Sequence, residues 1–255
     1  MVRPIRKLGA YGGLCSQIYD LSKPAPPADA FRYYLNECKK AKGPVLELMC
    51  GSGRFLIPLR EQGIDIDGID ASDEMLTACR AKARAKDLRV RLYHQFIEQI
   101  KLPRRYNLII IPASSFILVI DNAAVRKSLQ QIYNHLVVGG KLLVEIDTPA
   151  VTDARPGVWK GFWAERPDGA TIVFSVLGHY DGKDKVAYQI HKYELFEKGL
   201  LTTTELEHYA MRFYEKAEFK TLLQDTGFSR IQVTKPYGNQ PADGKEGTIM
   251  FEGYR

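Results

Sequence analysis

The sequence predicts an α/β fold, in which a doubly wound sheet of seven strands, the last of them antiparallel, carries an inserted antiparallel β meander. Three observations support this fold class. Short apolar segments alternate with amphipathic helical segments over the first part of the chain, as in a parallel sheet covered by helices. Between about residues 155 and 210, long strand-like stretches follow one another across the turns DGKD and EKG, which is typical of antiparallel strands. A helical segment and two strand-like segments then end the chain.

Five strands are expected before the meander, with helices between them. In chain order the strand segments read PVLELM, IDIDGID, VRLYHQF, YNLIIIP and KLLVEIDT. A first helix, over ADAFRYYLNECKKA, is expected to open the fold, and a second helix is expected to end at Gly63. A third helix should run from the N-cap Ser72 to about Lys86, and a fourth over AAVRKSLQQIYNHL as far as Gly139 and Gly140. Because YNLIIIP is apolar throughout, we expect it at the centre of the sheet, where both faces are buried.

The second half of the chain predicts the insertion and the end of the sheet. The meander strands are expected over ATIVFSVLGHY, KVAYQIHKYELF and LTTTELEHYAMRF. The helix EKAEFKTLLQDTGF, which is expected to end at Gly227, and the hairpin strands SRIQVTK and GTIMFEGYR follow. The expected division is therefore a main domain of residues 1–154 and 211–255, with residues 155–210 as an inserted subdomain.

The bulk composition limits the function classes. A chain of 255 residues with 45% hydrophobic content is long enough for one large α/β body. The net charge of +6 is compatible with a nucleic-acid partner, but the basic residues are spread along the chain, so that partner is not favoured. The four cysteines show no C-x-x-C pair and no His at zinc-finger spacing, so no metal site is expected. Without a run of about 18 apolar residues, a cytoplasmic protein with no membrane segment is expected.

The stretch LELMCGSGR places Gly51 and Gly53 between a strand and a helix. Glycines let the backbone approach a ligand, and free N–H groups at the helix start face it. Asp70 ends the next strand, 19 residues after Gly51, where a carboxylate can accept hydrogen bonds from both ribose hydroxyls of a nucleoside. Leu56 at the third glycine position and Glu47 before the turn argue against a dinucleotide, because the carboxylate would repel a pyrophosphate. A ligand with an ammonium group and a sulfonium would gain from Glu47, and S-adenosylmethionine has both.

The segment VLELMCGSGRFLIPLREQGIDIDGIDASDEML resembles the cofactor-binding signature of the class I S-adenosylmethionine-dependent methyltransferases, E/D-x-G/M-x-G-x-G followed by an acid that ends the second strand. LPRRYNLIIIPASSFILV and IYNHLVVGGKLLVEIDTP are similar to the fourth-strand and fifth-strand motifs of that superfamily, so the resemblance covers about Tyr19 to Pro149. It implies a Rossmann-like fold, S-adenosylmethionine as cofactor and methyl transfer as the activity. The cofactor-binding residues that it implies are Tyr19, Glu47, Gly51, Gly53, Asp70, Ala71, Met75, Gln95, Phe96, Ile97 and Pro112.

The resemblance also implies roles. Gly51 and Gly53 would pass under the methionine part, Glu47 would hold its amino group, and Asp70 would bind the ribose. Ala71 and Met75 would wall the adenine. The segment YGGLCSQIYD resembles the part that closes over the cofactor in small-molecule methyltransferases, so Tyr11 or Tyr19 would cap the sulfonium; a surface coil is the alternative.

Two segments depart from the pattern of the superfamily. After the third strand, HQFIEQI replaces the usual acid, which leaves open whether Gln95, Phe96 or Ile97 contacts the adenine. After the fourth strand, PASSF replaces the N/D-P-P-Y/F of enzymes that methylate amino groups of DNA and glutamine. Methylation of an exocyclic base amine is therefore disfavoured.

The meander is rich in aromatic residues and histidines and would form a lid with a pocket for a small organic acceptor. His179, His191 and Tyr193 are candidates for a catalytic base, and packing within the meander is the alternative for each. The leading hypothesis is an S-adenosylmethionine-dependent methyltransferase that acts on an N or O atom of a small molecule. The alternatives are an RNA methyltransferase and a cofactor-binding protein without turnover.

Overall fold

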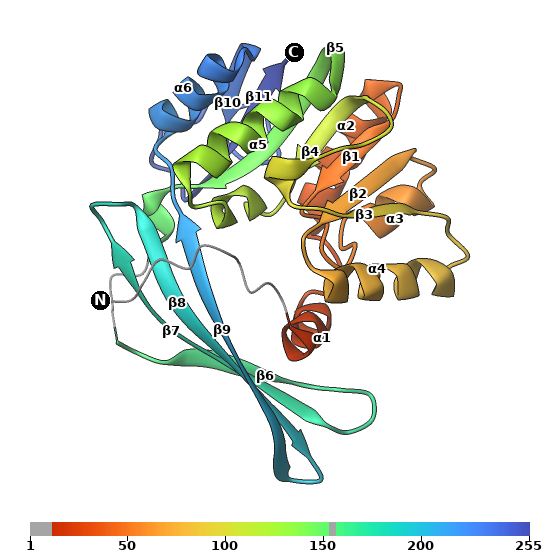
Figure 1. The fold of residues 1–255 in the computed structure, drawn as a ribbon, viewed down its shortest axis with the longest axis vertical. Coiled ribbons are helices and arrows are strands. Elements are labelled where there is room, and N and C mark those ends of the chain that lie inside the picture. The colour runs from red at the N-terminus through yellow and green to blue at the C-terminus, as the bar shows by residue number, and fades with distance from the viewer. Residues whose placement is uncertain (1–11, 153–156) are drawn as a thin grey trace.

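The structure, a computed structural model, describes residues 12–152 and 157–255 and contains two sheets (Figure 1). The larger sheet has seven strands in the order β10-β11-β5-β4-β1-β2-β3. Its strands are β1 Val45–Leu48, β2 Ile66–Asp70, β3 Arg91–His94, β4 Tyr106–Ile111, β5 Leu136–Asp147, β10 Ser229–Thr234 and β11 Thr248–Tyr254. The pairs β1–β2, β1–β4, β2–β3 and β4–β5 are parallel, whereas β11 runs antiparallel to β5 and β10. The predicted seven-stranded sheet with an antiparallel last strand is therefore confirmed.

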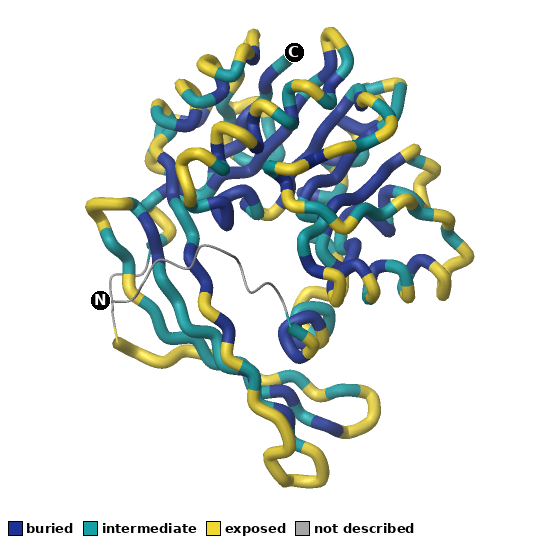
Figure 2. The backbone as a smooth tube through the Cα atoms, viewed as in Figure 1, coloured by how far each residue is buried: buried dark blue, intermediate teal, exposed yellow. Residues whose placement is uncertain are grey.

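Helices cover both faces of the larger sheet (Figure 1). These are α2 Ala28–Ala41, α3 Leu56–Glu61, α4 Asp73–Ala85, α5 Asn122–His135 and α6 Lys216–Thr226. In β4, Leu108 and Ile110 join the core under α2, α3 and α4, whereas Ile109 and Ile111 join the core under α5 and α6. Because side chains alternate along a strand, burial on both faces requires the continuous apolar run of this strand. Figure 2 shows these strands buried between the two helix layers.

The smaller sheet has four antiparallel strands in the order β6-β7-β8-β9 and extends away from the larger sheet (Figure 1). Its strands are β6 Lys160–Glu165, β7 Thr171–Asp181, β8 Val186–Glu197 and β9 Leu200–Arg212. The edge strand β6 was not among the expected meander strands. Five of its six residues are exposed, so it lacks the alternation of buried and polar positions that identifies a strand in a sequence.

Two further local expectations were wrong. The fold does not open with α2, because the helix α1, Gly13–Ser22, precedes it. The helix α5 ends at His135, and the pair Gly139 and Gly140 lies inside β5 instead of between helix and strand. Leu136 already pairs with Tyr106 of β4, so tertiary strand pairing overrides the expected glycine stop there.

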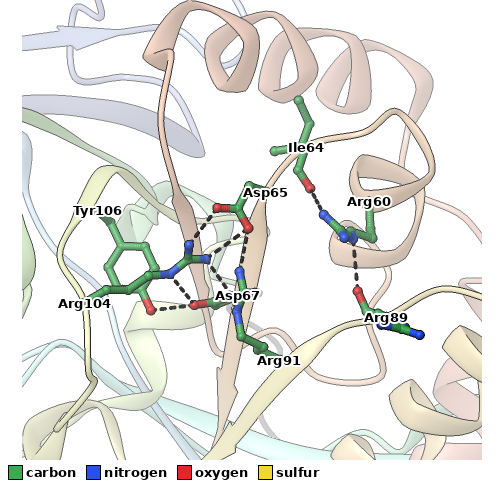
Figure 3. Close-up of polar contacts among 8 residues, drawn as sticks. All are labelled: Arg60, Ile64, Asp65, Asp67, Arg89, Arg91, Arg104 and Tyr106. Atoms are coloured by element: carbon green, nitrogen blue, oxygen red, sulfur yellow. Dashed lines mark hydrogen bonds and ion pairs between the residues drawn. The ribbon is translucent and has the colours of Figure 1, made fainter.

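Salt bridges fasten three strands at the end of the sheet opposite the glycine turn (Figure 3). The fully buried carboxylate of Asp67 accepts hydrogen bonds from Arg91 Nε at 2.7 Å, Arg104 Nε at 2.9 Å and the Tyr106 hydroxyl at 2.8 Å. Asp65 also pairs with both arginines, and their guanidinium groups lower its pKa. Both oxygens of the Asp67 carboxylate therefore have partners.

Within the described part of the chain, none of the helices is long and apolar enough to cross a membrane. In the same residues, no group of three His, Cys, Asp or Glu side chains is arranged to hold a metal ion.

Candidate functional site

A cavity of about 1060 Å³ lies at the carboxyl ends of β1, β2 and β4, with β8 and β9 of the smaller sheet on its other side. This volume lies just above the usual range for small-molecule sites, about 300–1,000 Å³. Ligands of open α/β sheets bind at this edge of the strands. Of the residues expected at the cofactor, those on the cavity wall are Tyr19, Glu47, Gly51, Asp70, Ala71, Met75, Gln95, Phe96, Ile97 and Pro112.

A hydrogen bond links the glycine turn to Asp70. Gly51 has φ of 53°, in the left-handed region that favours glycine. Its N–H donates to Asp70 Oδ2 at 2.7 Å, and the N–H of Ser72 donates to Oδ1 at 2.8 Å. Burial raises the pKa of Asp70, and these backbone donors act in the opposite direction. The carboxylate is thus held at the end of β2 with a fixed orientation toward the cavity.

Gly53 was expected beneath the methionine part of a cofactor, but it is not among the described residues of the wall. A Cβ at this position would lie 2.6 Å from Cys79 Sγ and 2.8 Å from Ile57 Cγ1. Its φ of 83° also lies in the left-handed region. Gly53 therefore allows the turn to pack closely against α3 and α4, and the structure does not bring it to the cavity.

Glu47 is a buried carboxylate of this site with an oxygen that no described residue satisfies. Its side chain comes from β1, is 3% exposed and lies on the cavity wall. In the described structure its Oε2 atom is buried without a hydrogen-bond partner. Burial, and then the neighbouring charge of Asp70, raise its pKa well above the ordinary value. A buried carboxylate oxygen without a partner is costly, and a cationic ligand group would satisfy it.

Helix α1 covers one side of the cavity. Tyr19 lies on the wall, and burial raises the pKa of its hydroxyl. The next residue, Asp20, accepts hydrogen bonds from the hydroxyl of Ser52 in the glycine turn and from Lys82 Nζ of α4 at 2.8 Å. Tyr11, the other tyrosine considered for this role, lies outside the described residues.

The segment after β3 forms a further part of the wall. The side-chain amide of Gln95 is bonded at both ends to the backbone of Lys101, at 2.8 and 3.2 Å. Phe96 is 36% exposed and Ile97 is 6% exposed. Glu98 also lies on this wall and was not among the expected site residues. The sequence carried a signal for Glu98, because it is an acidic residue just beyond the position after the third strand where an acid is usual.

The smaller sheet contributes different residues from those expected. The described wall does not include His179, His191 or Tyr193. The His191 ring stacks on Tyr209 with centroids 4.0 Å apart, and burial lowers the pKa of His191 to about 4. The Tyr193 hydroxyl donates to Cys15 Sγ at 3.1 Å, and the His179 ring stacks on that of Tyr188. Tyr193 therefore packs against α1 and His191 packs within the smaller sheet, whereas the His179 ring lies against Tyr188, a residue of the cavity wall.

Strand alternation explains which residues reach the cavity. The wall residues of β8 and β9 are Val186, Tyr188, His208, Ala210 and Arg212, all at even positions. His191 and Tyr193 are at odd positions of β8, on the face that packs with α1. The sequence shows this alternation but does not show which face meets the main domain.

The comparisons with known proteins find similarity to methyltransferases. Residues 45–140 match the family described as "Methyltransferase domain". A protein of Geobacillus sp. (strain WCH70), named a putative methyltransferase, is 25% identical over 253 residues that cover 91% of this chain and 95% of that protein. An S-adenosylmethionine-dependent methyltransferase from Clostridium acetobutylicum ATCC 824 has a similar crystal structure, with a TM-score of 0.76 and 18% identity over 94% of this chain and 96% of that one. A sugar N-methyltransferase from Streptoalloteichus sp ATCC 53650 has a TM-score of 0.77 and 18% identity over 100% of this chain and 98% of that one.

Proposed function

We propose that this methyltransferase, whose residues 45–140 match the methyltransferase-domain family, transfers the methyl group of S-adenosylmethionine to an N or O atom of a small molecule. The observation that carries the proposal is the buried Glu47 carboxylate on the cavity wall, with one oxygen left without a partner. An ammonium group is the ligand group that this oxygen favours, because it supplies both a hydrogen bond and the opposite charge.

The wall residues fit the rest of this cofactor. The fixed carboxylate of Asp70 offers acceptor oxygens to ribose hydroxyls. Met75 and Phe96 offer apolar and aromatic surface to the adenine, and Tyr19 covers the methionine side from α1. Gly51 lets the ligand approach the backbone of the turn, because it carries no side chain at this point of the wall.

The cofactor supplies an electrophilic methyl group on a sulfonium. The chain has to bring the acceptor atom into line with it, exclude water and remove a proton where the acceptor carries one. His208 takes the place of the three expected candidates as the proposed proton acceptor, because its imidazole lies on the cavity wall and a ring nitrogen can accept a proton from the acceptor. Ser115 and Asn122 lie on the same part of the wall and offer hydrogen bonds to an acceptor.

The preference for a small molecule rests on how the smaller sheet covers the cavity. Residues 155–210 act in this proposal as a substrate subdomain on a main domain of residues 1–154 and 211–255. The likeness to the sugar N-methyltransferase extends over both parts, and it supports a small acceptor. The net charge of +6 keeps an RNA acceptor as the rival, which predicts binding that weakens steeply with salt.

The first experiment is a calorimetric titration with S-adenosylmethionine and S-adenosylhomocysteine, with NAD as the control. Micromolar binding of the first two without NAD binding supports the proposal, and tight NAD binding or no binding overturns it. Methyl transfer from labelled cofactor to a panel of small amines and hydroxyl compounds, compared with transfer RNA, then separates the two acceptor classes. Label found only in RNA would reject the small-molecule assignment.

A further inference from the structure

Two carboxylates of β9 lie at the N-terminus of α1. The N–H of Gly12 donates to Glu207 Oε1, and the N–H of Leu14 donates to Glu205 Oε2 at 3.0 Å. The first N–H groups of a helix have no partner within the helix, and they form the positive end of its dipole, which carboxylates stabilise. These contacts join residues almost two hundred positions apart in the sequence.

Within the described chain, α1 receives no side-chain cap from its own N-cap residue and has no acid in its first turn. The backbone of Gly12, with φ of −63°, is one that any residue adopts. A Cβ there, however, would lie 2.8 Å from Glu205 Oε2 and 3.0 Å from Glu207 Oε1. Space for the two carboxylates therefore explains this glycine.

The rest of α1 connects these carboxylates to the cofactor site. Leu14, Cys15 and Ile18 pack into one apolar cluster with residues of β7 and β8. Further along the helix, Tyr19 lies on the cavity wall and Asp20 accepts a hydrogen bond from Ser52 of the glycine turn. Figure 1 shows α1 between α4 and the smaller sheet. One helix of ten residues, about 15 Å long, thus spans from the smaller sheet to the glycine turn.

We propose that Glu205 and Glu207 are positioning residues of the cofactor site, which hold α1 so that Tyr19 and Asp20 close over the cofactor. This inference rests on the proposed function, since it takes the ligand of the cavity to be S-adenosylmethionine. It follows that two carboxylates which do not line the cavity set the affinity for the cofactor. Because coupling between sites is reciprocal, bound cofactor should in turn stabilise the smaller sheet.

The test compares the affinity for S-adenosylhomocysteine, measured by calorimetry, among variants of the full chain. The double variant Glu205→Ala/Glu207→Ala should bind about tenfold more weakly, the size of effect expected from lost helix caps. Glu205→Gln/Glu207→Gln keeps an acceptor oxygen at each position and should recover part of the affinity. Glu194→Ala is the matched control, because this carboxylate of β8 pairs with Lys192 at 3.0 Å; its affinity should equal that of the wild type.

A second readout separates positioning of α1 from a general structural effect. Hydrogen exchange of α1 in the cofactor-free protein should be faster in the double alanine variant and unchanged in Glu194→Ala. In a chain that already carries Tyr19→Ala/Asp20→Ala, removing the two glutamates should weaken binding no further, since both changes act through α1. If the double alanine variant does not fold, Gly12→Ala perturbs the same contact from the helix side, and the same weakening is expected.

The outcomes distinguish the two proposals. If the wild-type protein does not bind S-adenosylhomocysteine, the proposed function is overturned, together with the role of the two glutamates toward that cofactor. If the wild type binds it and the double alanine variant or Gly12→Ala binds equally well, with unchanged exchange of α1, the inference alone is overturned. The inference would also be overturned if the losses of binding free energy caused by the two glutamate substitutions and by Tyr19→Ala/Asp20→Ala were fully additive.

Discussion

Replacing Glu47 by Gln should weaken cofactor binding and at the same time stabilise the cofactor-free protein. The two effects have one cause, because the buried carboxylate has an oxygen without a partner until a cation binds it. Glutamine has nearly the same shape but cannot ionise. It therefore removes both the cost of a buried charge in the free protein and the attraction for an ammonium group.

The magnitudes follow from the burial of this side chain. A hydrogen bond to a charged partner contributes about 1.5–3 kcal/mol, so the affinity for S-adenosylmethionine should fall by roughly ten- to a hundredfold. A buried polar group without a partner costs about 1–3 kcal/mol. In a protein of this size, each kcal/mol of stability regained should raise the Tm of the cofactor-free variant by about 2–4 °C.

The pH dependence identifies the group. The pKa of Glu47 is raised in the folded protein. The stability that this carboxyl group contributes is therefore fully present below its ordinary pKa of 4.5, and it is lost as the pH rises through the raised pKa. The wild type should therefore become less stable than Glu47→Gln over that window. Below the raised pKa, binding of an ammonium group should release the proton of the Glu47 carboxyl group. The affinity for S-adenosylmethionine should therefore increase with pH until Glu47 is ionised.

Calorimetry in two buffers of different ionisation enthalpy measures that proton, and thermal unfolding from pH 4 to pH 8 measures the stability difference. Glu194→Gln, which changes a carboxylate of the smaller sheet paired with Lys192, is the control and should change neither. Wild-type affinity in Glu47→Gln, or a cofactor-free variant less stable than the wild type at neutral pH, would refute the reasoning.

Three further substitutions test separate parts of the fold and site. Asp70→Ala should reduce cofactor affinity at least tenfold, because the carboxylate offered to the ribose is lost, and calorimetry with circular dichroism as the folding control checks this. Gly53→Ala should lower the free energy of unfolding by about 1–3 kcal/mol, since its Cβ would meet Cys79 Sγ at 2.6 Å; an unchanged urea midpoint would contradict it. Asp67→Ala should destabilise by about 1–3 kcal/mol, because the buried hydroxyl of Tyr106 loses its acceptor, while cofactor affinity measured on the folded fraction stays unchanged.

The sequence predicted the larger sheet well because its signals are local. The apolar run of β4, the N-cap at Ser72 and the C-terminal Gly227 of α6 each depend on neighbouring residues only, and all three occur as expected. The part of the cavity wall that the main sheet supplies was predictable for the same reason. Strand ends of a parallel sheet meet at one edge, so Glu47 and Asp70 were placed together by their spacing.

The part of the wall that the smaller sheet supplies was not predictable, because it depends on contacts between distant segments. One face of the smaller sheet lines the cavity and α1 packs on the other face. Helix α1 has weak local signals in the sequence. Its segment GLCSQIYDLS begins with glycine and contains two serines, residues with lower helix propensity than alanine or leucine. Its caps, Glu205 and Glu207, lie almost two hundred residues away, beyond any pattern that is read along the chain.

Two buried carboxylates on neighbouring strands of the same sheet give the clearest reason to place a ligand at Glu47. Asp67, at the start of β2, is fully buried, and both its oxygens are bonded to Arg91, Arg104 and Tyr106. Glu47, on β1, is almost as buried, yet one of its oxygens has no partner in the described structure. Both oxygens of Asp67, which links strands of the sheet, therefore have partners. One oxygen of Glu47, on the cavity wall, has none in the described structure. Since buried polar atoms are rarely left unsatisfied, the open oxygen of Glu47 supports our proposal that a cationic group of the ligand binds there.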